Sequence, residues 1–106
     1  MKAIIKKIFS TVCTLFSLRK VKHGLGCKCN FPCKFSSTTE LGNNCHFNGI
    51  KITGNGKVSI GSNFHSGKNI VVLTSFHNFD HGTAIPYDNT MYSRDVIIED
   101  NVWLGE

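Results

Sequence analysis

Proline, long apolar runs and N-terminal acidic residues are all scarce in this sequence. Only 2 of its 106 residues are proline, and the apolar segment near the N-terminus is interrupted by Ser10, Thr11, Thr14 and Ser17. That segment is too short and too polar to span a bilayer, and no small-x-small cleavage site of a secretory signal follows it. Hydrophobic residues make up 41% and charged residues 18%, a composition that argues against disorder and for one globular domain.

Several motifs that carry chemistry in other proteins are also missing. The sequence contains no G-x-S-x-G nucleophile elbow and no phosphate-cradling P-loop. Its five cysteines are an odd number, which does not suggest a closed disulfide framework. One residue separates Cys27 from Cys29 and three separate Cys29 from Cys33, unlike the C-x2-C pair of common zinc sites. We therefore expect reduced structural thiols, no metal ion and a cytoplasmic protein.

Positive charge is concentrated at the N-terminus. Residues 1–34 hold eight lysines and arginines and no acidic residue, whereas residues 35–106 hold four basic and seven acidic residues. A basic N-terminal segment of this kind suits an anionic membrane surface better than a nucleic-acid groove. The aromatic residues are not interleaved with the basic ones as a base-stacking platform requires, so no nucleic-acid partner is expected.

The N-terminal segment itself has helical periodicity. Its apolar residues recur every three or four positions, which predicts an amphipathic helix: Ile4, Ile5, Ile8, Phe9, Val12, Leu15 and Phe16. The simpler interpretation is a helix that packs on its own domain or on a neighbouring subunit. The alternative is a peripheral membrane contact, which would make the protein membrane-associated. We assign residues 1–26 to this basic helix and its linker, and residues 27–106 to a separate domain.

A period of six residues begins after the helix. The apolar residues Ile52, Val58, Phe64 and Ile70 are each six positions apart, and glycine and asparagine recur between such positions. Three units of this kind close a triangular coil of about eighteen residues, in which glycine and asparagine accept the unusual backbone angles of the turns. The strands of a β-sandwich usually recur every eight to twelve residues, so that alternative fits poorly. The pattern predicts an all-β fold of stacked parallel coils, with a slip near residues 53–56.

Residues 78–94 contain no hexad and interrupt the repeat. A loop of this length in a compact repeat fold is usually functional or disordered. Its apolar and aromatic content is too high for simple disorder. We therefore predict an ordered excursion that lies over a site.

The hexads from Ile60 to Ile70, the run Ser75-Phe76-His77 and the stretch from Asp95 to Gly105 resemble the hexapeptide-repeat O-acetyltransferases. The similarity is closest to enzymes that acetylate sugars of bacterial O-antigen (in lipopolysaccharide biosynthesis), capsule or exopolysaccharide, and it covers roughly residues 27–106. This resemblance implies a left-handed parallel β-helix, acetyl-CoA as donor, a sugar or polysaccharide precursor as acceptor, and a homotrimer with active sites between subunits.

The resemblance also implies roles for individual residues. His77 falls on the family's catalytic histidine, Asn48 on an asparagine that helps to hold the acceptor, and Trp103 on a tryptophan close to the donor pocket. In the excursion, Asp80 is a candidate to orient His77 or the sugar. Tyr87 and Asp88 are candidates to line the acceptor cleft. Histidine suits a general base because its pKa lies near working pH. Asn48 as an ordinary turn residue and Trp103 as a packing residue remain open alternatives.

Glu106 falls inside a hexad, directly after Leu104 and Gly105. We therefore expect the chain to be the front part of a longer enzyme and to be inactive by itself, because a coil stack that stops there leaves an open strand edge. The alternative from another functional class is a non-catalytic β-helix that serves as a structural or binding module.

Overall fold

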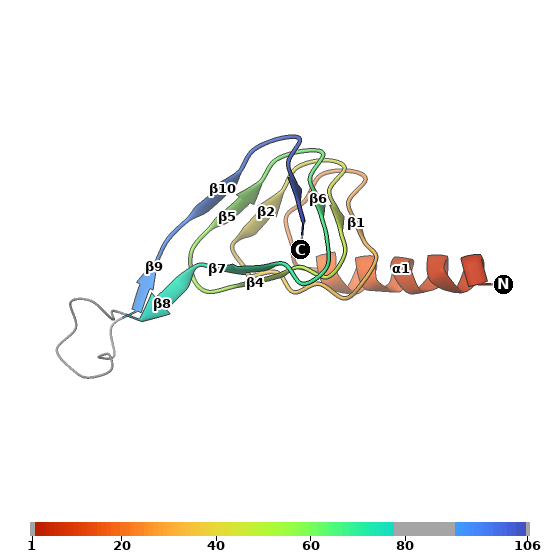
Figure 1. The fold of residues 1–106 in the computed structure, drawn as a ribbon, viewed down its shortest axis with the longest axis horizontal. Helices are drawn as coiled ribbons and strands as arrows, with labels where there is room; N and C mark the ends of the chain where they lie inside the picture. Colours follow the sequence, from red (N-terminus) through yellow and green to blue (C-terminus); the bar gives the residue numbers. More distant parts are fainter. Residues whose placement is uncertain (1, 78–90, 106) are drawn as a thin grey trace.

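The computed structural model describes residues 2–77 and 91–105. These residues form one helix, α1 (Lys2–Leu18), followed by short strands (Figure 1). The strands are β1 (Lys28–Cys29), β2 (Thr39–Leu41), β3 (His46–Phe47), β4 (Lys51–Thr53), β5 (Val58–Ile60), β6 (His65–Ser66), β7 (Val71–Leu73), β8 (Ser75–His77), β9 (Met91–Ser93), β10 (Val96–Ile98) and β11 (Trp103–Leu104).

Three of the sheets are parallel, and the chain visits them in a repeating order. Their strand orders are β1-β3-β6-β11, β2-β5-β10 and β4-β7, so that β2, β3 and β4 belong to three different sheets, as do β5, β6 and β7. Figure 1 shows the three sheets as the sides of a triangular outline. This strand-rich arrangement is compatible with the expected parallel β-helix.

The register of the parallel strands confirms the expected spacing. Lys28 pairs with His46, eighteen positions later, and Glu40 pairs with Ser59, nineteen positions later. The predicted slip is also present, because Lys51 pairs with Val71 at a distance of twenty positions. The extra length lies in the turn between β4 and β5, which contains two glycines.

The chain leaves the parallel sheets once. Strands β8 and β9 pair antiparallel with each other, and the chain then returns so that Ile97 of β10 lies beside Ser59 of β5. The excursion predicted for residues 78–94 therefore starts already at Ser75. Three of the candidate site residues, Asp80, Tyr87 and Asp88, lie outside the described residues.

The hexad positions form the core of the strand region. Ile52, Val58 and Phe64 are buried, and Ile70 is partly buried against them. The ring of Phe64 lies 5.5 Å from that of Phe47 on the neighbouring strand, centroid to centroid. Removal of these side chains from water supplies the main driving force for stacking the short strands.

Asparagines occupy the equivalent turns that lead from the β2-β5-β10 sheet to the β1-β3-β6-β11 sheet. Asn44, Asn63 and Asn101 have φ angles of 56°, 60° and 62°, in the left-handed region that asparagine tolerates better than most residues. Their side chains form a column, in which Asn44 Nδ2 donates to Asn63 Oδ1 and Asn63 Nδ2 donates to Asn101 Oδ1, each at 3.0 Å. The expectation that asparagine takes the turn angles is confirmed at these corners.

Helix α1 covers the edge of β1 with hydroxyl groups. Thr14 Oγ1 accepts a hydrogen bond of 2.9 Å from the backbone N–H of Cys29, and Ser17 Oγ accepts one of 3.0 Å from Cys33 N–H. Ser10 Oγ lies 3.0 Å from Asn30 Oδ1 and donates to it. An edge strand has unpaired backbone groups, and Thr14 and Ser17 satisfy two of those in and after β1.

The helix thus packs on its own domain, as the simpler interpretation required, but with its polar side. The seven apolar residues that predicted the helix point away from the sheets, with exposed fractions between 47% and 69%. The amphipathic pattern correctly predicted the helix. The pattern did not say which side of the helix meets the domain. The polar side does so, because the open edge of β1 needs hydrogen-bonding groups rather than apolar surface.

Candidate functional site

His77 lies at the end of β8, where the chain has just left the parallel sheets. It pairs with Met91 of β9, and its side chain is exposed. On the same two strands the rings of Phe76 and Tyr92 lie 5.9 Å apart, and the Arg94 guanidinium lies 5.6 Å from the Tyr92 ring. An exposed imidazole on a ribbon with aromatic side chains can exchange protons with a bound hydroxyl compound.

Thr74 directly precedes β8, is fully buried, and anchors the antiparallel pair of β8 and β9. Thr74 Oγ1 donates 2.8 Å to the carbonyl of Thr53 and accepts 3.0 Å from Gly56 N–H. The returning chain is tied to the same residue, because Arg94 N–H donates 2.8 Å to the Thr74 carbonyl. A Cβ at position 56 would collide with the Arg94 carbonyl, so only glycine fits there. The exit and return of the excursion are thus fixed at one point, which positions β8 and His77.

Asn48 lies in a different corner, directly after β3. Its Oδ1 accepts a hydrogen bond of 3.0 Å from Asn30 Nδ2, and its Nδ2 donates 2.8 Å to the carbonyl of Ser66. It also lines a hollow of about 300 Å³ together with Lys68 and Phe31. These bonds place Asn48 at a corner of the coil, and its role in acceptor binding stays a prediction.

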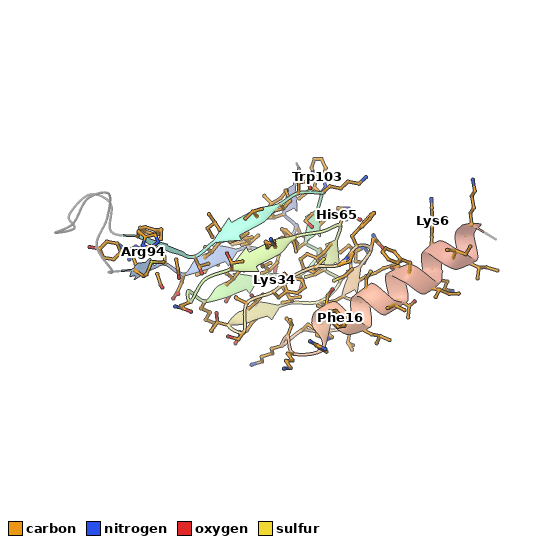
Figure 2. All side chains as sticks on the ribbon, turned by 90° about the horizontal axis from the view of Figure 1, so that it is seen from below. Lys6, Phe16, Lys34, His65, Arg94 and Trp103 are labelled. Atoms are coloured by element: carbon orange, nitrogen blue, oxygen red, sulfur yellow. The ribbon has the colours of Figure 1, made fainter. Side chains whose placement is uncertain are left out.

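Trp103 is 69% exposed and lies on β11, in the four-stranded sheet rather than beside β8. Figure 2 shows Trp103 well separated from Arg94, which ends the excursion. Within a single chain, Trp103 therefore lies apart from the antiparallel strands β8 and β9, which carry His77.

Trp103 belongs instead to a row of side chains that the sequence analysis missed. The pairing places Lys28, His46, His65 and Trp103 at successive positions across the sheet, and the rings of the two histidines lie 6.1 Å apart. His65 is not among the residues for which the sequence predicted a role. The signal was present in the sequence, since His46 and His65 are nineteen positions apart, about one coil.

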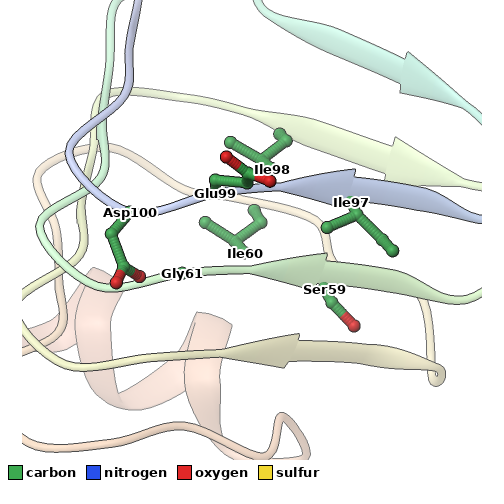
Figure 3. Close-up of a pocket in the computed structure, with 7 residues that line it drawn as sticks. All are labelled: Ser59, Ile60, Gly61, Ile97, Ile98, Glu99 and Asp100. Atoms are coloured by element: carbon green, nitrogen blue, oxygen red, sulfur yellow. The ribbon is translucent and has the colours of Figure 1, made fainter.

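A second hollow, of about 490 Å³, lies along β5 and β10 (Figure 3). Its acidic side chains are Glu99 and Asp100, and Asp100 Oδ1 accepts a hydrogen bond of 2.7 Å from Ser62 N–H. Gly61 permits this approach, because a Cβ there would collide with the Asp100 carboxylate. None of the three candidate site residues that the structure describes, His77, Asn48 and Trp103, lines this hollow, and the bond to Ser62 gives Asp100 a structural role.

The thiols beneath α1 have unequal acidities. The Cys29 thiol donates to Cys33 and thereby lowers the pKa of Cys33 to about 7, with help from the backbone N–H groups of Gly49 and Ile50. The same bond, together with burial, raises the pKa of Cys29. Burial raises the pKa of Cys45 to about 11. All five cysteines are free thiols, and residues 2–77 and 91–105 contain no group of three or more potential metal ligands.

Comparisons with protein-family models, with characterised proteins and with solved structures find no significant match to this chain. Within the part of the chain that the structure describes, no helix has the length and apolar character needed to cross a membrane.

Proposed function

We propose that the chain is part of a left-handed parallel β-helix acyltransferase of the hexapeptide-repeat type. In this proposal it moves an acetyl group from acetyl-CoA to a sugar hydroxyl during surface polysaccharide biosynthesis, in the cytoplasm. The observation that carries the proposal is the position of His77, on the first strand that leaves the stack of parallel coils. The free thiols suit a reducing compartment.

The chemistry needs a base, a polarised thioester and alignment of the two substrates. The His77 imidazole removes the proton of the acceptor hydroxyl while that oxygen attacks the thioester carbonyl. A carbon–oxygen bond forms, the carbon–sulfur bond breaks, and the CoA thiolate leaves with the proton that His77 carried. Backbone N–H groups stabilise the oxyanion of the tetrahedral intermediate, and alignment of both substrates supplies a large part of the rate.

A homotrimer would complete this site. Within one chain, Asn48 follows β3 and Trp103 lies on β11, whereas His77 lies on β8 in a different sheet. A neighbouring copy is a source of donor-binding side chains beside the ribbon of β8 and β9, and Trp103, exposed on an edge strand, is available for such a contact.

Because residues 1–106 are expected to be inactive by themselves, the test is acetyl transfer by a purified protein that contains these residues together with any further coils encoded after them. A panel of free sugars serves as acceptors, and mass spectrometry measures the acetylated product. His77→Asn should lower the transfer rate about 10²- to 10⁴-fold, because it removes the base and keeps a polar side chain. His65→Asn is the matched control, since His65 is also exposed and lies on a different sheet. Undiminished transfer by the His77→Asn variant would refute the mechanism.

A second candidate function is a non-catalytic binding module. The observation that favours it is the flat row of Lys28, His46, His65 and Trp103, which could contact a long ligand without any reaction. Binding of a glycan in the absence of acetyl-CoA, weakened by Trp103→Ala and unaffected by His77→Asn, would favour the module over the enzyme.

A further inference from the structure

The apolar side of α1 is exposed along its length, and the ring of Phe31 touches it only at its edge. We call it the outer face of α1, and it consists of Ile4, Ile5, Ile8, Phe9, Val12, Leu15 and Phe16. Phe9 contacts the ring of Phe31 at its edge, at 5.9 Å between centroids, and is the least exposed of the seven. Seven large apolar side chains on one helix face form a continuous patch of the kind that marks a docking surface.

The orientation of the helix is fixed from its other side. Thr14 and Ser17 hydrogen-bond to the backbone of Cys29 and Cys33, and Ser10 and Cys13 are buried beneath the helix. Figure 2 shows α1 at one end of the strand stack. Rotating the helix to bury the outer face would break these bonds. The contacts on its polar side therefore keep the apolar side facing outward.

The charges around the outer face have one sign. Lys2, Lys6 and Lys7 lie on the same helix, and Arg19 and Lys20 follow it directly. At 100° per residue, Lys2 falls about 20° beyond Phe9 at one edge of the outer face, and Lys7 about 60° beyond Ile4 at the other. Lys6 falls on the side of Ser10 and Cys13. The Arg19 guanidinium lies 4.3 Å from the centroid of Phe16. No acidic residue occurs before Glu40.

This distribution of charge selects the occupant. Two copies joined through this face would bring their lysines together, and residues 1–34 offer no carboxylate to pair with them. A bilayer accepts an apolar helix face to a depth of about 5–10 Å, while its anionic headgroups pair with lysines on the flanks. We propose that the outer face of α1 binds the surface of a lipid bilayer that carries anionic headgroups, and that it does so independently of the acetyl transfer proposed above.

The test is co-sedimentation of the full chain with vesicles. Phosphatidylcholine vesicles that contain phosphatidylglycerol should bind the chain, pure phosphatidylcholine vesicles should bind it more weakly, and salt should release it. The double variant Ile8→Gln/Leu15→Gln removes the centre of the outer face and should lower the partition coefficient by about tenfold or more. Lys2→Gln/Lys7→Gln should lower it by about fivefold for each lysine on the anionic vesicles only.

Ile97→Gln is the matched control, because Ile97 is 77% exposed but lies on β10, remote from the helix in sequence and sheet. It should bind vesicles as the unchanged chain does. Undiminished vesicle binding by the Ile8→Gln/Leu15→Gln variant would overturn the proposal. So would lipid-free oligomers, detected by sedimentation velocity, that dissociate on this double substitution, since the face would then join copies of the chain. Neither outcome depends on whether acetyl transfer occurs.

Discussion

The backbone N–H of Cys29 donates a hydrogen bond of 2.9 Å to the side-chain hydroxyl of Thr14. The same hydroxyl lies 3.2 Å from the Cys29 carbonyl, so one side chain meets both backbone groups of an edge residue. A further strand would normally supply these contacts in a parallel sheet. The helix takes the place of that strand and leaves its apolar side free for another contact.

Thr14→Val should reduce the free energy of unfolding by about 1–3 kcal/mol, because it leaves the Cys29 N–H without its partner beneath the helix. Thr11→Val is the control. The Thr11 hydroxyl bonds only within the helix, 2.8 Å from the Lys7 carbonyl, and Thr14 makes the equivalent bond to Ser10. The loss of helical back-bonding is therefore the same in both variants. Urea unfolding measures the difference, and equal destabilisation by the two substitutions would contradict the edge-covering role of Thr14.

Asn63→Ala should destabilise the fold by about 1–2 kcal/mol, because alanine is strained at a φ of 60° and cannot continue the asparagine column. Asn63→Gly keeps the backbone angle without strain but loses the side-chain bonds. The difference between the two variants in thermal or urea unfolding thus separates the backbone contribution from that of the column. If the alanine variant is as stable as the glycine variant, the left-handed angle is not a constraint at this corner.

Cys33 should be the thiol that alkylating agents modify fastest near neutral pH. Its pKa is lowered to about 7, so its thiolate fraction rises as the pH passes through that value, whereas burial keeps Cys45 protonated to about pH 11. The rates can be followed by iodoacetamide labelling and peptide mass spectrometry.

Cys29→Ala removes the thiol that donates to Cys33, so the pKa of Cys33 should rise and its labelling near neutral pH should slow. Cys27→Ala is the control, because the Cys27 thiol interacts with Cys45 and does not contribute to the lowered pKa of Cys33. The same lowered pKa also determines how the free energy of unfolding changes with pH. A thiol with a lowered pKa in the folded state stabilises the fold above its ordinary value of 9.0, and this contribution is lost as the pH falls through about 7. Faster labelling of Cys33 in the Cys29→Ala variant would reverse this assignment.

The period of six predicted the strand region well, for a physical reason. Ile52, Val58 and Phe64 are buried because each coil returns its inward positions to the same core after a fixed number of residues. The parallel register near eighteen positions and the slip around residues 53–56 follow from the same regularity. Such patterns are local and repeated, so a single sequence contains them in full.

The features that the sequence did not reveal depend on partners distant along the chain. The helical period of residues 4–16 defines an apolar face but not the surface that it meets. The open edge of β1 determines that the helix packs on the domain with its hydroxyl groups instead. Ser75–His77 has the composition of a coil strand, yet it pairs antiparallel with β9. The sequence context of Asn48 does not reveal its bonds to Asn30 and Ser66, which place it at a corner of the coil.

The column of Asn44, Asn63 and Asn101 has a direction. Each amide gives its N–H to the oxygen of the residue one layer further from α1, so every dipole in the column points the same way. A layer inserted upside down would set two oxygens or two N–H groups against each other. The corner therefore distinguishes one end of the stack from the other, and the polarity of its amides fixes the orientation in which a further layer can be added.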